Sequence, residues 1–517
     1  MQELSLPIQK ALTQGLRPRD DIGRNAEFLT QCQYMKPLPF GLRPCIDCTN
    51  PFDEDYFDAW PFPQLIITAS ETLLAYENSI YSVTNNITYS TYSLEDPSIK
   101  KPITGTGIWH CVDLGEGWLL FNGTCVVFKL STETMFGEDQ VVYCQDAVSV
   151  QTGCANRGRL ILGGFNPAQL FSGAWSEIWN KYLNNLSASV STDFSGSDNF
   201  VYWSTIGGGD ILLPFAPGFI KDGMIKEDKP DEHDEEFFLE LFRRNELGWM
   251  PMPWQGSVLC VKPLGKGIAV YGTSGIAGLI PTVEPYPTYG LQRVADFGIF
   301  SRGAVGGDEQ GHIFIDTSGN IWGLDASFTL RELGYKEYIA SMVADEIVIT
   351  KDAEYNEYHI SGKDKSFVLT AKGLGQSPQI ITGAYNTAGK FYGVFNIADN
   401  KEAIIATDII DFAYRDLKTI TIIEAGCSAS NNVFVAVDYR YSKQGAWQRS
   451  PWVLTNPEGF ARLQVTAIDF RVVVKCNSYE NFELDYIKVR WQTSGRRTVR
   501  GVDAGTANFQ SDSPSMA

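Results

Sequence analysis

The chain has 517 residues, of which 44% are hydrophobic and 20% charged, a composition that is typical of a folded protein and excludes a disordered one. This length is too great for one ordinary domain, so two or three domains are expected. A formal net charge of −19 at pH 7 gives a surface that repels nucleic acid and anionic membranes. Stable binding of the whole chain to either is therefore not expected.

The sequence opens without a basic and apolar leader, and no apolar run approaches about 18 residues. We therefore expect neither a signal peptide nor a membrane span. The 10 cysteines are too sparse for a secreted disulfide scaffold, so reduced thiols are expected.

Residues 1–63 show no sustained hydrophobic periodicity and contain a proline-rich run from 37 to 63. Because such a segment cannot form a core of its own, we predict an extended N-terminal arm that lies on the body or on a neighbouring subunit. Removal of residues 1–35 is then expected to abolish assembly and leave a folded, β-rich monomer. The charged residues of the arm are candidates for subunit contacts: Arg17, Arg19, Asp20, Asp21 and Arg24.

Residues 64–415 are dominated by short apolar or alternating runs bounded by Gly, Asn, Asp and Ser, which is typical of antiparallel strands. Asn122-Gly123 separates two such runs and predicts a hairpin with a type I′ turn, in which both central residues need positive φ. Consecutive meanders of this kind predict a mainly β fold with a β-propeller-like body, or a large sandwich as the alternative. The predicted strands are 118–121 and 124–130; 257–262, 267–271 and 276–280; 312–316 and 320–324; and 346–350, 357–360 and 366–370.

Two helical insertions are predicted within this body, near 168–186 and near 230–246. In the first, apolar side chains recur at helical spacing and form one apolar face: Trp175, Ile178, Trp179 and Tyr182. In the second, acidic residues come first and Arg243-Arg244 last, an order that complements the helix dipole. The acidic run 231–236 could instead hold a divalent cation, but the first turn of a helix explains it without a ligand.

Residues 416–503 carry longer alternating strands and predict a separate β-sandwich, and the Gly-, Ser- and Ala-rich residues 504–517 predict a disordered tail. The predicted strands are 419–424, 432–441, 462–469, 470–476 and 482–492. The sandwich ends at a basic cluster of Arg496, Arg497 and Arg500. Given the acidic chain, we interpret this cluster as a contact to an acidic neighbour rather than a nucleic-acid patch.

The patterns that would carry chemistry are incomplete. Cys45 and Cys48 have the spacing of half a zinc site, but no second pair and no nearby histidine completes it. The 4 histidines lie far apart, and the sequence contains no nucleophile elbow, P-loop or complete dinucleotide fingerprint. We therefore predict no catalytic site, no metal and no cofactor.

Three features give the chain a resemblance to bacteriophage tail proteins, especially the β-propeller-containing tail tubular or nozzle proteins of short-tailed phages. They are the Gly-Leu-Arg-Pro-Arg-Asp-Asp arm at 15–21 with a second Gly-Leu-Arg-Pro at 41–44, the meandering blades such as 303–324, and the C-terminal run Leu-Asp-Tyr-Ile-Lys-Val-Arg at 484–490 before the arginine cluster. The resemblance implies a homo-oligomeric ring, often six-fold, around a channel that conducts DNA. It also implies other tail proteins as partners, DNA only as passing cargo, and a virion location after synthesis in the host cytoplasm.

The first functional hypothesis is therefore a ring-forming structural component of a phage tail, without enzymatic activity. The alternative is a host-surface or glycan-binding propeller, because sugars stack on exposed tryptophan and tyrosine. A second alternative is a glycoside hydrolase with two paired carboxylates, although the sequence does not single out the pair.

If DNA passes through a ring, acidic side chains are expected to line the lumen, because a basic wall would bind the phosphates. The most concentrated acidity lies just before and at the start of the second helical insertion, at Glu227, Asp228, Asp231, Glu232, Asp234, Glu235 and Glu236. An outward orientation towards another virion protein is the alternative for this cluster.

Overall fold

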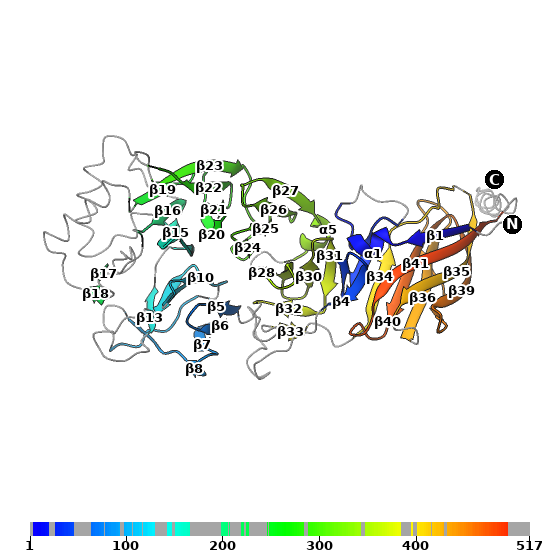
Figure 1. Cartoon of the computed structure of the whole chain (residues 1–517), viewed down its shortest axis with the longest axis horizontal. Coiled ribbons are helices and arrows are strands. Elements are labelled where there is room, and N and C mark those ends of the chain that lie inside the picture. The colour runs from blue at the N-terminus through cyan, green and yellow to red at the C-terminus, as the bar shows by residue number, and fades with distance from the viewer. Residues whose placement is uncertain are drawn as a thin grey trace, which may run out of the picture.

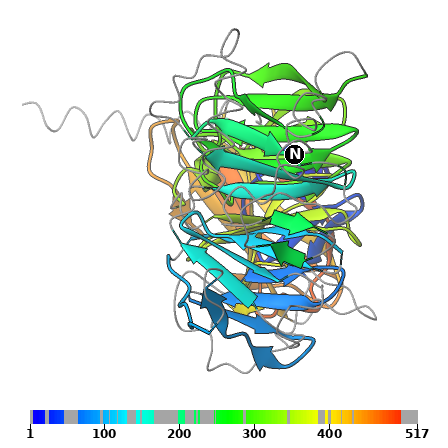
Figure 2. The same cartoon turned by 90° about the vertical axis from the view of Figure 1, so that its left-hand side faces the viewer.

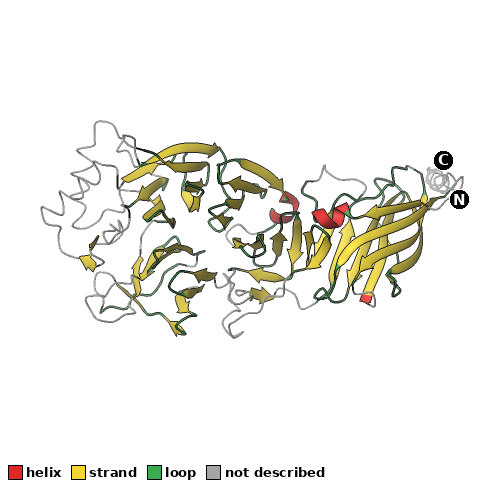
Figure 3. Cartoon of the chain, viewed as in Figure 1, coloured by secondary structure: helices red, strands yellow, loops and turns green. Residues whose placement is uncertain are grey.

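The computed structural model describes residues 4–19, 26–45, 64–76, 78–93, 98–105, 107–115, 117–129, 142–146, 150–165, 198–204, 206, 219–221, 224–226, 246, 248–283, 288–342, 347–383, 394–396, 401–414, 416–428 and 432–494. Strands dominate these residues, and the α-helices among them are the short α1 (Lys10–Gln14) and α5 (Lys336–Ile339) (Figure 3). No helix in this part of the chain has the length and apolar character needed to cross a membrane.

Six antiparallel sheets follow one another along the described part of the chain, and each is a blade of a β-propeller (Figure 1). The first three are β5 (Gln64–Ile67), β6 (Thr72–Tyr76), β7 (Ser79–Ser82) and β8 (Ile87–Thr88); β10 (His110–Asp113), β11 (Trp118–Phe121), β12 (Cys125–Lys129) and β13 (Val142–Asp146); and β14 (Thr152–Asn156), β15 (Arg159–Phe165), β16 (Phe200–Trp203) and β19 (Gly248–Pro251). The parallel strand β9 (Thr91–Ser93) extends the second blade beside β13.

The next three blades have the same simple meander. They are β20 (Val258–Leu264), β21 (Gly267–Gly272), β22 (Ile276–Pro281) and β23 (Tyr289–Ala295); β24 (Val305–Asp308), β25 (Gly311–Ile315), β26 (Ile321–Asp325) and β27 (Leu330–Gly334); and β28 (Val348–Asp352), β29 (Glu357–Ser361), β30 (Ser366–Leu369) and β31 (Leu374–Ser377). Two hairpins lie outside these blades, β17 (Phe219–Lys221) with β18 (Met224–Lys226) and β32 (Gln379–Ile381) with β33 (Val394–Asn396).

The arrangement of the blades follows from their first strands. Strands β5, β10, β14, β20, β24 and β28 all line one cavity, with the outer strands of each blade further from it. Figure 2 shows the blue, cyan and green blades side by side when the molecule is turned by 90°. First strands around a common axis define a propeller, so the predicted propeller-like body is confirmed.

Local turn chemistry explains why the meanders form where the sequence predicts them. At the β25–β26 hairpin the Asp316 carboxylate accepts hydrogen bonds from the backbone N–H of Ser318 and Asn320 and from Trp322 Nε1, at 2.8, 2.9 and 2.8 Å. Gly319 adopts a φ of 90°, which favours glycine. The turn residues therefore fix the register of the two strands.

The β11–β12 hairpin is confirmed, but its turn differs from the prediction. Gly123 has a φ of 93°, whereas Asn122 is absent from the residues with positive φ, so the turn is not type I′. Asn122 Oδ1 instead accepts the backbone N–H groups of Thr124 and Cys125, each at 2.9 Å. The asparagine side chain thus closes the turn in place of a left-handed backbone.

The C-terminal strands form two facing sheets with a shared core, the predicted β-sandwich. They are β35 (Lys418–Cys427), β36 (Val433–Arg440), β37 (Gln448–Arg449), β38 (Val453–Leu454), β39 (Phe460–Ala467), β40 (Asp469–Cys476) and β41 (Leu484–Thr493). Strand β34 (Ala403–Thr407), which precedes the predicted boundary at 415, pairs with β40 and so belongs to a sandwich sheet.

The N-terminal segment (residues 4–45) is part of these sheets. It contains β1 (Leu4–Ile8), β2 (Leu29–Gln33), β3 (Met35–Leu38) and β4 (Gly41–Pro44). Strands β1 and β4 pair with β41, and β2 lies between β31 of the sixth blade and β34 of the sandwich. One ten-stranded sheet, the joined sheet, therefore runs from the propeller into the sandwich.

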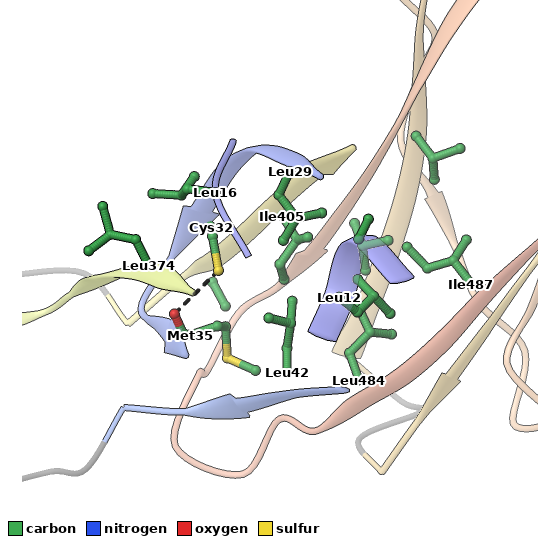
Figure 4. Close-up of a cluster of buried hydrophobic side chains, with 14 of the residues drawn as sticks. Leu12, Leu16, Leu29, Cys32, Met35, Leu42, Leu374, Ile405, Leu484 and Ile487 are labelled. Atoms are coloured by element: carbon green, nitrogen blue, oxygen red, sulfur yellow. Dashed lines mark hydrogen bonds between the residues drawn. The ribbon is translucent and has the colours of Figure 1, made fainter. Parts of the chain in front are cut away.

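The described part of the predicted arm thus lies on the body of its own chain, as strands and one helix rather than as an extended coil. Its apolar side chains meet side chains of the sixth blade and the sandwich in one core (Figure 4): Leu12, Leu16, Leu29, Cys32, Met35 and Leu42 beside Leu374, Ile405, Leu484 and Ile487. Removing residues 1–35 would take several of these buried side chains away. A chain without residues 1–35 is therefore expected to lose stability and not to remain a folded monomer.

The predicted tail 504–517 and the predicted helices near 168–186 and 230–246, apart from Glu246, lie outside the described residues.

Candidate functional site

The first strands of the six blades line a cavity of about 320 Å³, the central cavity. This volume is at the lower end of the range of small-molecule sites. The described residues of the lining include three basic or potentially basic side chains, His110, Lys262 and Arg302, and no aspartate or glutamate. In a chain with a net charge of −19, this lining has the opposite sign to the protein as a whole.

His110, at the start of β10, is held from both sides of its ring. Its Nδ1 lies 2.8 Å from Thr152 Oγ1 and its Nε2 lies 3.0 Å from the Arg302 carbonyl oxygen. A carbonyl oxygen can only accept, so Nε2 carries the proton and donates, and Nδ1 accepts from the threonine hydroxyl. Thr152 Oγ1 in turn accepts the Val261 N–H at 3.1 Å.

These hydrogen bonds form a chain along the cavity wall. It runs from Val261 of the fourth blade through Thr152 of the third and His110 of the second to Arg302, which precedes the fifth blade. The imidazole is neutral because burial, followed by the charges of Arg302 and Lys262, lowers the pKa of His110 well below its usual value, and the hydrogen bond to the Arg302 carbonyl oxygen opposes this shift only in part. Both ring nitrogens are engaged within the protein. His110 therefore positions blades and is poorly placed to act as a general base.

Arg302 links the fifth blade to the opposite wall. Its Nη2 donates to the carbonyl oxygens of Phe121, at 3.2 Å, and Gln151, whereas its buried Nε has no hydrogen-bond partner. A Cβ on Gly123 would lie 2.6 Å from Arg302 Nη1, so a glycine makes room for the guanidinium. Burial lowers the pKa of Arg302 to about 10, and the group remains charged at neutral pH.

Lys262, on β20, supplies the second positive charge. It is half-buried, and among the described residues no carboxylate forms an ion pair with it. Its charge contributes to the low pKa values of His110 and of His312, which lies on the neighbouring blade. Two cations therefore lie close to one imidazole without a carboxylate among the lining residues.

Three cysteines reach the same region, Cys111, Cys154 and Cys260. Burial raises the pKa of each thiol, and a neighbouring Asp113 raises that of Cys111 further. Protonated thiols are poor metal ligands and poor nucleophiles. The lining is therefore suited to hold an anion rather than to bind a soft metal.

A separate cluster lies between the N-terminal segment and the sixth blade, where the oxygens of Asp352 and Glu357 approach His359. The Lys36 ammonium lies 2.7 and 2.8 Å from the two Glu357 oxygens, so a cation of the chain itself already compensates this carboxylate. Burial raises the pKa values of Asp352 and Glu357, and burial and Lys36 lower that of His359 to about 3. A divalent ion would have to displace Lys36, and we interpret the cluster as a structural clamp.

The residues predicted as contact sites are not gathered at the central cavity. Arg17 pairs with Glu337 at 3.2 Å and Asp408 at 3.8 Å, and Arg19 pairs with Glu332 at 2.6 Å. Both guanidiniums thus fasten the N-terminal segment to its own chain, and a role in assembly stays a prediction.

The other predicted contact residues fall outside the described part of the chain. They are Asp20, Asp21, Arg24, Arg496, Arg497 and Arg500, together with the acidic cluster of Glu227, Asp228, Asp231, Glu232, Asp234, Glu235 and Glu236.

Sequence reasoning did not single out Lys262 and Arg302, and it treated His110 only as an isolated histidine. A usable signal existed, because each of the three lies in or next to the first strand of a meander. In a propeller these strands face the axis, so polar residues on them are candidates for a shared site.

Comparison with known proteins gives little beyond this geometry. No protein-family model and no curated protein matches the chain. Solved structures with some likeness include PorZ, a surface component of the type-IX secretion system of Porphyromonas gingivalis, with 10% identity, a TM-score of 0.30 and coverage of 66% of this chain but 35% of PorZ.

Two further structures have similar values. An exo-β-1,3-galactanase from Phanerochaete chrysosporium has 8% identity, a TM-score of 0.27 and coverage of 82% of this chain and 100% of its own. AztD from Citrobacter koseri has 8% identity, a TM-score of 0.34 and coverage of 82% and 94%. Such scores carry no argument about function, and the fold assignment rests on the strand pairing described above.

Proposed function

We propose that the protein is a structural component of a bacteriophage tail that assembles into a homo-oligomeric ring. The observation that carries the structural part is the joined sheet. Strand β2 connects the sixth blade to the sandwich by main-chain hydrogen bonds, which couples the two bodies. We expect this sheet to limit bending between the propeller and the sandwich, a property that suits a tail component. The phage assignment itself rests on the resemblance of the sequence.

A DNA channel would have to run between subunits rather than through the propeller. The central cavity has a volume of only about 320 Å³, and the chain of His110, Thr152 and Arg302 crosses its wall. A duplex is far wider than this space. The acidic cluster at 227–236 remains the proposed lining of the lumen between subunits.

The glycan-binding alternative requires exposed aromatic rings, but two half-buried tryptophans of the sandwich already contact cationic side chains. The guanidiniums of Arg440 and Arg471 lie 4.7 and 4.3 Å from the ring centre of Trp447. Arg449 and Lys475 each lie 5.5 Å from that of Trp452. Cation–π contacts of this kind compete with a stacked sugar, so this surface does not favour the alternative.

The proposal is tested by electron microscopy and mass measurement of the purified full chain. We expect a closed ring, with a triple charge reversal at Arg496, Arg497 and Arg500 giving a folded monomer. Arg293→Glu is the matched control, because this arginine lies on the propeller surface and, within the described part of the chain, pairs only with the exposed Asp296. A monomer at every concentration would contradict the proposal. A ring unaffected by the triple reversal would contradict the role of the arginine cluster.

A further inference from the structure

The central cavity contains an unusual charge arrangement for a buried site. Arg302 and Lys262 both line it, and no aspartate or glutamate is among its lining residues. Uncompensated charge in a region of low dielectric is costly, so buried cations are normally paired. Here the described lining of the cavity supplies no carboxylate to pair with these cations.

Both cationic side chains that line the cavity lack an ion pair among the described residues. Arg302 Nε has no hydrogen-bond partner although it is buried, and the Lys262 ammonium has no ion pair among the described residues. The neutral His110 lies near both, as their joint effect on its pKa requires. A ligand in the cavity can therefore lie beside two cationic side chains without displacing an existing salt bridge.

We propose that the central cavity of the propeller is a binding site for a small anion, with Lys262 and Arg302 as the groups that neutralise its carboxylate or phosphate oxygens. Charge-assisted hydrogen bonds from such groups are shorter and stronger than neutral ones. The cavity volume of about 320 Å³ limits the ligand to a compact molecule, such as inorganic phosphate or a small polycarboxylate. Bound there, the anion contacts side chains from the fourth and fifth blades and stabilises the closed ring of blades.

This site is independent of the proposed tail function, because it lies inside one subunit. Anion binding by a chain that forms no oligomeric ring, or an oligomeric ring of chains that bind no anion, would separate the two proposals. Lys262 is the residue to change, since Arg302 also holds the carbonyl oxygens of Phe121 and Gln151 and its loss could unfold the propeller.

The experiment uses the full chain in a buffer free of phosphate and carboxylates, at constant ionic strength. Inorganic phosphate and citrate are titrated by calorimetry, and glucose serves as a neutral ligand of similar size. We expect saturable binding of at least one anion, a rise in melting temperature with its concentration, and no binding of glucose. Whichever anion binds identifies phosphate or carboxylate as the preferred group.

Lys262→Gln should weaken that binding by about tenfold or more, as the loss of a charge-assisted hydrogen bond predicts. Lys266→Gln is the matched control, because Lys266 lies on the same β20–β21 hairpin but is exposed; its affinity should be unchanged. As a second readout, amine acylation followed by mass spectrometry should show Lys262 protected by the anion and Lys266 not. No saturable binding of either anion, equal losses in both variants, or equal binding of glucose would each overturn the proposal.

Discussion

In the propeller, the four strands of each blade pair in the order in which they occur in the chain, whereas the sandwich also pairs strands from the two ends of the chain. Strands β20 to β23 lie within 38 residues of sequence, from Val258 to Ala295. Strand β1 pairs with β41, from Leu4↔Trp491 to Ile8↔Ile487. The strands of the two regions are similar, but the blade pairs strands that are close in sequence, whereas the sandwich includes a pair that is almost the whole chain apart.

The difference shows where stability is concentrated. A blade can form from local turns, but it must still pack on its neighbours to bury both faces. The sandwich and the sixth blade depend on the N-terminal segment, which contributes strands to both sheets and side chains to the core (Figures 1 and 4). Ordering such distant segments costs loop-closure entropy that only the completed core offsets. We therefore expect the joined sheet to be the most sensitive part of the molecule.

Deletion of residues 1–35 should have the largest effect. It removes the buried Ile8, Leu12, Leu16 and Leu29, and each large-to-small change at such a site alone costs ~2–5 kcal/mol. The sum is comparable to the whole stability of a typical domain, about 5–15 kcal/mol. Circular dichroism and thermal unfolding should show loss of the sandwich.

The control for this deletion is Leu4→Ala, at a side chain that is 42% exposed, and it should change stability by no more than about 0.5 kcal/mol. A truncated chain that unfolds at the temperature of the full chain would show that the joined sheet is dispensable.

The next largest effect is expected from Lys36→Met. This change leaves Glu357 buried without its counter-charge, and breaking a buried pair typically costs about 3–5 kcal/mol. Adding Glu357→Gln should restore most of the loss, because no uncompensated charge remains. Chemical denaturation of the two single variants and the double variant measures the coupling.

Lys401→Met is the matched control for Lys36→Met. Its partner is Glu480, and the lysine side chain is 63% exposed, so we expect a change of no more than about 1 kcal/mol. Equal effects at both lysines would mean that the clamp between the N-terminal segment and the sixth blade does not contribute.

Glu71→Gln tests the propeller separately. Burial opposes ionisation of Glu71, but hydrogen bonds from Ser82, Trp118, Tyr89 and Lys129 outweigh it and lower its pKa below 4.5. The substitution should cost about 1–3 kcal/mol. Hydrogen exchange should increase in the first and second blades and stay unchanged in the sandwich.

The effect of Glu71→Gln has a definite dependence on pH. Because the folded-state pKa is depressed, the contribution of the carboxylate is present above pH 4.5 and is lost as the pH falls through the folded-state value. The difference in melting temperature between the variant and the natural chain should therefore shrink in acid. A difference that grows as the pH falls would contradict this assignment, and Glu309→Gln, at an exposed turn, is the control.

Asp438→Asn should have the smallest effect. Asp438 accepts two hydrogen bonds from Arg449, at 2.6 and 2.8 Å, on the outer side of the sandwich, where the arginine side chain is 45% exposed. We expect a loss of about 0.2–1 kcal/mol that decreases with added salt. A large loss that is independent of salt would show that this ion pair on the sandwich stabilises the fold as much as the contacts of the joined sheet do.

Most of the local architecture could be predicted from the sequence. The hairpins around residues 317–319 and 264–266 lie where glycine and polar turn residues separate alternating runs, and the sandwich strands follow from the same periodicity. These signals are local because a β-turn and its flanking strands are set by a few neighbouring residues.

The N-terminal segment shows the limit of such reasoning. Its strands are short and broken by Pro7, Pro37 and Pro44, so no periodic signal marks them. They become strands because β41, β34 and β31 present free edges to them. Tertiary context of this kind overrides local propensity.

The central cavity depends on tertiary structure in the same way. The sequence by itself determined that the chain is mainly β, where strands of four of its six blades lie, and that no complete catalytic motif is present in it. Only the closure of six blades brought His110, Lys262 and Arg302 together, across up to 192 residues of sequence. Residue spacing records which neighbours share a strand or a turn, whereas a site built from one strand of each blade is fixed by the packing of whole sheets.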